Sequence, residues 1–335
     1  MLQVAARLDR IRFQPTVIAL DGSGPLRSEL PADVPILDLK TPQLRHAIRA
    51  LRRTFSHSSP NVVFSTMGYL NLGIVIANIG RFSPRPRIVI REANIPAATL
   101  TALGSPILGK IAYRLLYRLA DTIICNAEFV RDQLGVMGVP TELISIVHNP
   151  VDVDNLRRLA HENPSPQYGG FVSAGRLVHQ KGYDRLLHWF AECSRNSRLT
   201  IFGEGPQRAE LTALVRSLGL TGRVDLPGYC KQPWGTIARA DAYLLPSRWE
   251  GMSNAALEAL AVGTPVVACR EAGGIEEIAA TAGAVKVVDG APAFVAAMKA
   301  VPPRIEGPTL RPSLLPDKFA LDTVVHLYEQ ILSGD

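Results

Sequence analysis

The stretch Trp249–Pro265, WEGMSNAALEALAVGTP, contains the start and end signals of one helix together with two carboxylates. Ser253 is a favoured N-cap residue, and Gly263 with a proline shortly after it is a common C-terminal signal. The pattern therefore predicts a helix that begins after Ser253 and ends at Gly263. Glu250 then lies in the loop before the helix, and Glu258, eight positions later, lies inside its second turn.

The exposed N–H groups at the start of such a helix form a site for a phosphate or diphosphate, because they carry the positive end of the helix dipole. A carboxylate beside that site would repel phosphate, so its useful partner is a hydroxyl group, from which an ionised Glu can only accept. Two such acceptors around one anion site suggest a nucleotide-sugar. From the spacing alone, a solvated Glu250 and an ordinary helix-surface Glu258 are equally consistent.

The composition describes a globular protein. With 335 residues, of which 47% are hydrophobic and 20% charged, the chain is long enough for two domains. A net charge of +6 and a pI of 9.3 are too weak for nucleic acid, but suit a protein that handles anionic nucleotides or touches an anionic membrane face. The four scattered cysteines favour a reducing cytosol and no metal site. Neither a signal peptide nor a membrane span is predicted, so we expect a cytoplasmic protein.

Strands and helices alternate along the first half, as in a doubly wound α/β domain. The predicted helices are Met1–Ile11, Thr41–Phe55, Leu72–Ile79 and Ser105–Leu119, and the predicted strands are Thr16–Leu20, Asn61–Phe64, Arg87–Ile90, Asp121–Cys125 and Ile144–Val147. The strand over 87–90 leads into the polar residues Arg91-Glu92-Ala93-Asn94. Because ligands of open parallel sheets bind at the carboxyl ends of strands, this cluster is a candidate wall of a binding site.

The predicted helix Ser105–Leu119, SPILGKIAYRLLYRL, places Lys110, Arg114 and Arg118 among aliphatic residues and tyrosines. Such a helix could rest on an anionic membrane surface. A partly buried helix whose cations extend to solvent fits the same pattern equally well.

The second half repeats the alternation after a polar segment that contains prolines, 153–169, which we interpret as an interdomain linker. Arg176 and Lys181 follow the predicted strand Gly170–Ala174, in a loop at its carboxyl end. A guanidinium and an ammonium could hold a diphosphate and stabilise it as it leaves, although two solvated cations fit as well. Gly203-Glu204-Gly205 lacks the third glycine of a dinucleotide fingerprint, which disfavours a Rossmann oxidoreductase.

Several ordered blocks resemble the retaining glycosyltransferases of family four, which have the GT-B fold and a Glu-x7-Glu motif. The blocks within residues 170–280 are AGRLVHQKGYDRLL, LTIFGEGPQRAELTALVRSLGL, RVDLPGY, ARADAYLLPS and EGMSNAALEALAVGTPVVACREAGG. Weaker likeness in the first half lies at NVVFSTMG, RIVIREAN, TIICNAEFVRDQL and IVHNPVD. The resemblance implies an α/β protein with two Rossmann-like domains facing a central cleft. Its parts would be an acceptor-side domain at 1–152, the linker at 153–169, a nucleotide-sugar domain at 170–317, and a C-terminal helix at 318–335 that packs back on the first domain.

The same resemblance assigns roles to individual residues. Glu250, Arg176 and Lys181 match the catalytic positions, with Glu250 on hydroxyls of the donor sugar and the two cations on the phosphates. Glu258 matches the position that binds the ribose. The remaining donor-binding positions are Gly251, Met252, Ser253 and Asn254, through backbone N–H groups, and Gly203, Gly228 and Tyr229, near the nucleobase. Enzymes of this type generally need no bound metal and no cofactor.

The expected reaction is retaining transfer of a hexose or N-acetylhexosamine from a nucleotide-sugar, with a UDP-sugar favoured, to a growing surface polysaccharide or lipid-linked glycan. The basic helices motivate a further expectation, peripheral contact with the anionic inner membrane face. A catalytically impaired binding protein that keeps the donor site is the alternative. An epimerase of the same architecture is disfavoured by the Glu-x7-Glu block.

The chain departs from the family pattern at two places. Family members usually open with a strand and a glycine-rich turn before the first helix, and we expect the first sheet of this chain to lack that strand. Many relatives also place a His after the strand that corresponds to 87–90, where this chain has the residues 91–94. Arg91 and Asn94 are the predicted acceptor-side residues.

Overall fold

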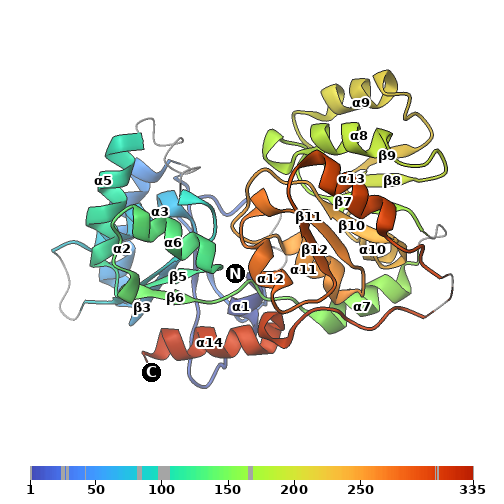
Figure 1. Ribbon diagram of the computed structural model, residues 1–335. Helices are drawn as coiled ribbons and strands as arrows, with labels where there is room; N and C mark the ends of the chain where they lie inside the picture. Colours follow the sequence, from blue (N-terminus) through green and yellow to red (C-terminus); the bar gives the residue numbers. More distant parts are fainter. Residues whose placement is uncertain are drawn as a thin grey trace. The chain divides into compact units, whose positions relative to one another are not determined.

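The computed structural model describes residues 2–23, 27, 30–41, 43–80, 85–96, 106–164, 169–305, 307 and 309–334. The chain forms two compact units (Figure 1). Unit 1 comprises Met1–Pro150 and Asp322–Asp335, and unit 2 comprises Val151–Leu321. Each unit contains parallel strands and helices in the Rossmann-like arrangement, so the predicted α/β fold with two such domains is confirmed.

The main sheet of unit 1 has four parallel strands in the order β3-β4-β5-β6. Their bounds are β3 Val62–Ser65, β4 Arg87–Glu92, β5 Thr122–Cys125 and β6 Ile144–Ile146. The helices α2 Leu44–Ser58, α3 Gly68–Asn78 and α5 Pro106–Leu116 form a packed series in which α3 contacts both of the others, and η2 Tyr117–Leu119 and α6 Glu128–Val136 follow α5. The start of the predicted helix Ser105–Leu119 lies outside the described residues.

One apolar cluster of unit 1 joins the two ends of the chain. It contains Val4 of α1 Leu2–Arg7, Val89 and Ile124 of the central strands, and Tyr328 of α14 Leu321–Ser333. The ring of Tyr328 is buried, and its centroid lies 5.7 Å from that of Phe64. The C-terminal helix therefore completes the core of the first unit.

Two further strands of unit 1, β1 Val17–Ala19 and β2 Ile36–Asp38, pair only with each other. Their residues are half-buried or exposed, whereas those of β4 and β5 are almost entirely buried. Among the described residues, no strand connects this small sheet to β3. The strands of unit 1 are thus divided into two separate sheets.

Unit 2 has one parallel sheet of six strands in the order β12-β11-β10-β7-β8-β9. The bounds are β7 Phe171–Ala174, β8 Leu199–Phe202, β9 Val224–Gly228, β10 Ala242–Leu245, β11 Val266–Cys269 and β12 Val285–Val288. The helices are α8 Tyr183–Ala191, α9 Arg208–Ser217, α10 Trp234–Arg239, α11 Asn254–Ala261, α12 Ile275–Ala279 and α13 Gly290–Ala300. The order of strands reverses between β7 and β10, which is where ligands bind in open parallel sheets.

The predicted linker 153–169 is largely a helix, α7 Val153–Glu162, that packs on α10 and α11 within unit 2. The Asp152 carboxylate accepts from the backbone N–H of Asn155 and so caps the helix. Arg157 donates to two carbonyls of unit 2, those of Ala261 and Arg311. The neighbouring prolines suggested a linker, but the cap and the buried residues of the helix attach this segment to the second unit.

Replacing Tyr328 with Ala should test how far unit 1 depends on α14. The substitution removes a fully buried ring from the shared core, and we expect a loss of about 3–5 kcal/mol in the free energy of unfolding. Urea denaturation followed by circular dichroism measures this loss. The matched control is Thr323→Ala on the exposed side of the same helix, which should change little. Equal effects of the two substitutions would contradict the packing described.

Candidate active site

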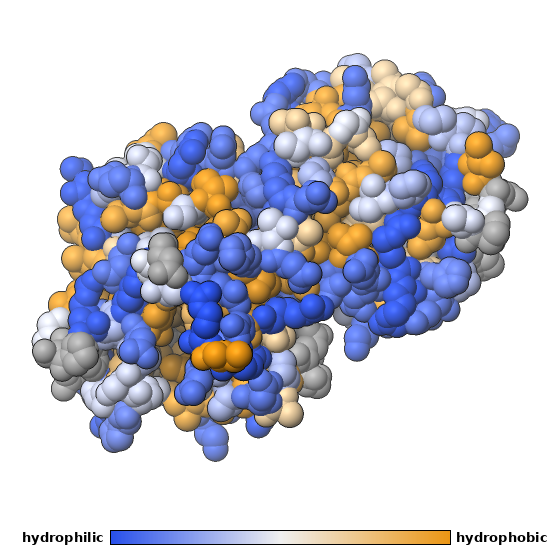
Figure 2. All heavy atoms as spheres, turned by 90° about the horizontal axis from the view of Figure 1, so that it is seen from below, coloured by the Kyte–Doolittle hydropathy of each residue, from blue (hydrophilic) through white to orange (hydrophobic). Residues whose placement is uncertain are grey.

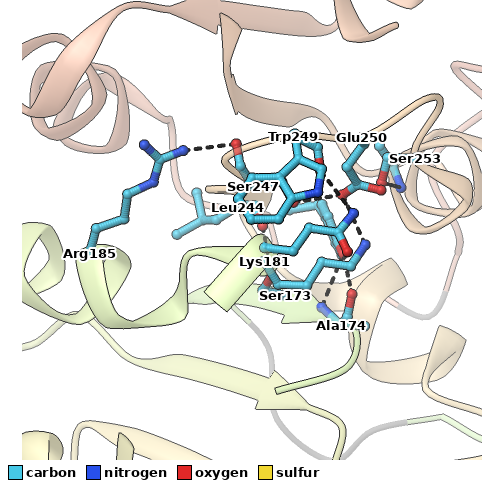
Figure 3. A network of polar contacts seen from close by, with 12 residues as sticks. Ser173, Ala174, Lys181, Arg185, Leu244, Ser247, Trp249, Glu250 and Ser253 are labelled. Atoms are coloured by element: carbon cyan, nitrogen blue, oxygen red, sulfur yellow. Dashed lines mark hydrogen bonds and ion pairs between the residues drawn. The ribbon is translucent and has the colours of Figure 1, made fainter. Parts of the chain in front are cut away.

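Three polar side chains meet at the point where the strand order of unit 2 reverses. The Nζ of Lys181 lies 2.9 Å from Oε1 of Glu250, and the hydroxyl of Ser247 donates to the same oxygen at 2.6 Å. Lys181 comes from the loop after β7, while Ser247 and Glu250 come from the loop after β10 (Figure 3). The carboxylate is nearly buried, so the ammonium and the hydroxyl compensate a charge that would otherwise be costly.

A second set of contacts joins the loop after β10 to the first turn of α8 and to the loop that precedes this helix. The guanidinium of Arg248 donates to both carboxylate oxygens of Asp184, at 2.7 Å each, and its hydrogen bonds lower the pKa of that carboxyl. The backbone N–H of Arg248 donates to the carbonyl of Gln180, whose side chain donates to the carbonyl of Trp249. These contacts hold the two residues that directly precede Glu250. None was anticipated from the sequence.

The backbones of the two loops also approach closely. Arg185 donates to the carbonyls of Pro246 and Ser247, at 2.7 and 2.8 Å. Gly182 has a φ of 68°, and a Cβ at this position would lie 2.2 Å from the carbonyl oxygen of Pro246. Only glycine fits both the left-handed conformation and the contact.

Helix α11, Asn254–Ala261, begins and ends as the sequence predicts. The Ser253 hydroxyl accepts from the backbone N–H of Ala256, and Gly263, with a φ of 85°, follows the helix. The N-terminus of α11 therefore comes directly after the loop that holds Glu250. The residues at this start are buried with the exception of the last: Gly251, Met252, Ser253 and Asn254.

Glu258 lies in the second turn of α11 and faces α10. Its Oε2 accepts a hydrogen bond from the indole Nε1 of Trp234 at 3.3 Å. Burial raises the pKa of this carboxyl, and the bond from Trp234 partly offsets the rise. The sequence indicated Glu258 but not the partner that orients it, because the two residues lie 24 positions apart.

The other predicted donor-side residues also lie at the carboxyl ends of strands in unit 2. Arg176, after β7, is exposed, and its guanidinium has no partner among the residues that the structure describes. Gly203 follows β8, and a Cβ there would lie 1.9 Å from the carbonyl oxygen of Gly175. Gly228 ends β9 with a φ of 91°, and Tyr229 after it is exposed.

The two predicted acceptor-side residues of unit 1 differ in exposure. Arg91 is buried within β4, and its guanidinium donates to the side chain of Asn149. Its carbonyl accepts from the side chain of Asn71 at 3.0 Å. Asn94, in the loop after β4, is exposed. The structure thus gives the Arg91 side chain a place in the core of unit 1 and leaves Asn94 accessible.

Glu92, between these two residues in the sequence, is completely buried. Its Oε2 accepts hydrogen bonds from the hydroxyls of Tyr113 and Tyr117, at 3.1 and 2.7 Å. Burial raises the pKa of Glu92, and the two tyrosine hydrogen bonds oppose that rise. The carboxylate therefore connects the end of β4 to α5 and η2, a connection that the sequence analysis missed.

Solved structures share this architecture over the whole chain. HepE of Anabaena, in complex with UDP and glucose, has a TM-score of 0.76 and 17% sequence identity, and the alignment covers 100% of this chain and 95% of that one. At this level of identity the likeness establishes the fold.

Two family models match the chain in succession. The model described as Glycosyltransferase Family 4 matches residues 1–155, and the model described as Glycosyl transferases group 1 matches residues 161–300. The chain belongs to the GT-B glycosyltransferases. The Rossmann-like units described above are therefore the two domains of one glycosyltransferase fold.

Curated relatives of this glycosyltransferase act on several acceptors. A Campylobacter jejuni protein named N-acetylgalactosamine-N,N'-diacetylbacillosaminyl-diphospho-undecaprenol 4-alpha-N-acetylgalactosaminyltransferase is 28% identical over 76% of this chain and 69% of its own length. A Mycobacterium tuberculosis protein named GDP-mannose-dependent alpha-(1-6)-phosphatidylinositol dimannoside mannosyltransferase is 32% identical over 49% of this chain and 45% of its own length. The second match thus spans less than half of that relative.

The described part of this glycosyltransferase contains no group of three or more His, Cys, Asp or Glu side chains arranged to hold a metal ion. Within the same residues, no helix is both long and apolar enough to cross a membrane. The four cysteines are free thiols, and burial raises the pKa of Cys269 to about 11.

Comparing Gly182→Ala with Gly219→Ala should separate the cost of the steric contact between the two site loops from the cost of backbone strain. Both glycines have left-handed backbones, with φ values of 68° and 66°, but a Cβ at Gly219 meets nothing within 4 Å. We expect Gly219→Ala to cost about 1–2 kcal/mol from backbone strain alone. Gly182→Ala should cost clearly more, because the methyl group displaces the carbonyl of Pro246. Similar unfolding free energies in urea would show that the loops are not held together as described.

Glu258→Gln should change how stability depends on pH. The raised pKa means that the folded protein holds this proton more tightly than the unfolded chain, whose carboxyl has the ordinary value of 4.5. The protonated carboxyl of Glu258 therefore contributes to the free energy of unfolding below pH 4.5, and this contribution is lost as the pH rises through the folded-state pKa. Thermal unfolding should therefore show equal stability of wild type and variant near pH ~4, and a more stable variant near pH ~8. A variant that is less stable at high pH would contradict this.

Proposed function

We propose that this chain transfers a hexose or N-acetylhexosamine from a UDP-sugar, with retention of configuration, to a growing surface polysaccharide or a lipid-linked glycan. The observation that carries the proposal is the placement of Lys181 on Glu250, next to the N-terminus of α11, the helix whose second turn contains Glu258. Cationic donors for a diphosphate and carboxylate acceptors for hydroxyls thus occur in one loop cluster, as a nucleotide-sugar requires.

Each residue has a distinct task in this proposal. Arg176 and Lys181 bind the diphosphate and stabilise the negative charge that grows on it as the bond to the sugar breaks. Glu250 accepts from hydroxyls of the sugar, and Glu258 accepts from the ribose. The acceptor oxygen forms its new bond on the face from which the diphosphate departs, and the departing phosphate takes the acceptor's proton. Positioning and electrostatic stabilisation account for the catalysis, without a bound metal or a cofactor.

The backbone at the start of α11 supports the binding of the donor. The N–H groups of Gly251, Met252, Ser253 and Asn254 would face the sugar and phosphate, and Gly203, Gly228 and Tyr229 would border the base. UDP in the HepE structure supports uridine, whereas the name of the mycobacterial relative makes guanosine the alternative to test.

Unit 1 would bind the acceptor. Asn94 is exposed at the carboxyl end of β4 and can contact it, whereas Arg91 would act by holding Asn149. The undecaprenol-linked sugar in the name of the Campylobacter relative supports a lipid-linked acceptor. The enzyme would then act at the inner, cytoplasmic face of the membrane.

A binding protein without transferase activity is the second candidate. The division of the described strands of unit 1 into two separate sheets favours it, because a change confined to the acceptor domain would leave donor binding intact. Donor binding without release of UDP, in the presence of a membrane lipid extract as acceptor source, would establish this alternative.

Calorimetric titration with UDP-glucose, UDP-N-acetylglucosamine and GDP-mannose tests the donor site. We expect a UDP-sugar to bind, and Lys181→Met to weaken binding ~10- to 100-fold through loss of a charge-assisted contact with phosphate. Glu258→Ala should abolish the preference for the nucleoside diphosphate over free diphosphate, because the ribose loses its acceptor.

The matched control is Lys299→Met, an exposed lysine of α13 that the proposal does not use. A folded chain that binds none of the three donors, or that binds them equally after Lys181→Met and Lys299→Met, would refute the assignment of this site.

A further inference from the structure

Helix α5 and the following η2 expose a row of large aliphatic side chains. The exposed fractions are 72% for Ile107, 67% for Leu108, 48% for Ile111, 58% for Leu115 and 44% for Leu119. Residues four positions apart lie on one side of a helix, so Ile107, Ile111 and Leu115 form a continuous ridge. On the face of the molecule drawn in Figure 2, hydrophobic residues also lie at the surface among hydrophilic ones. We call the five residues the α5 apolar face.

The opposite side of the same helix is anchored in the core. Tyr113 and Tyr117 are fully buried, and both donate to the buried carboxylate of Glu92. The Tyr117 hydroxyl also accepts from the side chain of Asn71 on α3, at 3.2 Å. Turning the apolar face inward would break these buried hydrogen bonds, which is costly. The exposure of the five aliphatic residues is therefore imposed by the fold of unit 1.

Cations border the α5 apolar face along one ridge. Lys110, Arg114 and Arg118 are exposed and lie four residues apart. Arg118 also donates to the carbonyl of Gly138, at 3.3 Å, which holds its guanidinium beside the helix. The sequence contains no Asp or Glu from position 93 to position 120. An apolar face beside a purely cationic ridge is complementary to a bilayer that carries anionic headgroups.

We propose that the α5 apolar face, with its cationic ridge, docks unit 1 on the surface of an anionic membrane. The aliphatic side chains enter the boundary between headgroups and acyl chains, and the cations contact the lipid phosphates.

A second copy of the chain fits the α5 apolar face less well than a membrane does. Two α5 helices that met about a twofold axis would bring their cationic ridges together, with no acidic residue on either helix to compensate. The inference deepens the proposed function, since it identifies the surface on which a lipid-linked acceptor would be met.

Vesicle co-sedimentation tests the proposal with the whole chain. The vesicles are phosphatidylcholine alone or phosphatidylcholine with added phosphatidylglycerol, at low and at high salt. We expect binding to the anionic vesicles that weakens with salt, and much weaker binding to the neutral ones. The double variant I111S/L115S should lose about tenfold or more in affinity, because it removes the centre of the apolar ridge. K110A/R114A should lose roughly 30-fold on anionic vesicles only.

Matched controls use exposed residues of unit 2. Ile305→Ser removes an aliphatic side chain that is 90% exposed, and R195A/R216A removes two exposed cations. Both controls should bind vesicles as the wild type does. Because every substituted side chain is exposed, the variants should fold, and circular dichroism checks this.

Three results would overturn the docking surface. The first is equal binding of wild type and I111S/L115S, and the second is equal binding to neutral and anionic vesicles. The third is a wild-type dimer in analytical ultracentrifugation that becomes monomeric in I111S/L115S, which would make a second copy the occupant. Titration of the same preparations with UDP-sugar separates the two proposals, because vesicle binding without donor binding refutes only the proposed function.

Discussion

The contact between Lys181 and Glu250 is the constraint on which the site depends. The carboxylate is nearly buried at the switch point of a parallel sheet, where an uncompensated charge could not remain. Its two partners come from different loops, Lys181 after β7 and Ser247 after β10, so the charge can be buried only if the loops converge. Two features hold the loops together: the close contact between Gly182 and the carbonyl of Pro246, and the ion pair between Arg248 and Asp184.

Two buried carboxylates, Glu250 and Glu92, and the half-buried Glu258 are accommodated in three different ways. Glu250 is paired with an ammonium, Glu258 accepts from the indole of Trp234, and Glu92 accepts from two tyrosine hydroxyls. A cation compensates the charge itself, whereas neutral donors only reduce the cost of burial, which agrees with the raised pKa values of Glu258 and Glu92. Environment, and not residue type, thus distinguishes the carboxylates of the candidate site from a carboxylate that anchors a helix.

The fold class and the start of α11 could be predicted because their signals are local: the alternation of strands and helices, and a Ser253 that caps the next turn. The ion pair between Asp184 and Arg248 could not be predicted from the sequence. It joins residues 64 positions apart and has no sequence pattern of its own. Within the predicted linker 153–169, residues 153–162 form a helix, which the sequence analysis did not predict. The helix itself contains no proline: the prolines that suggested a linker, Pro150 and Pro164, lie outside it, and tertiary packing shows that the helix belongs to unit 2. Likewise, the position of Arg91 after a run of aliphatic residues did not reveal that its side chain enters the core.

The chain crosses between the units twice, and the crossings are held together where Val151 and Ala320 form an isolated parallel bridge. Unit 1 is therefore discontinuous in sequence, since α14 reaches its apolar cluster only after all of unit 2 has been made. During synthesis on the ribosome, Val89 of β4 and Ile124 of β5 lack their packing against α14 while some 170 residues are added, from Val151 to Leu321. The second unit, by contrast, is continuous and can complete its core as it emerges. We therefore expect unit 1, which begins the chain, to reach its full stability only after unit 2 has folded.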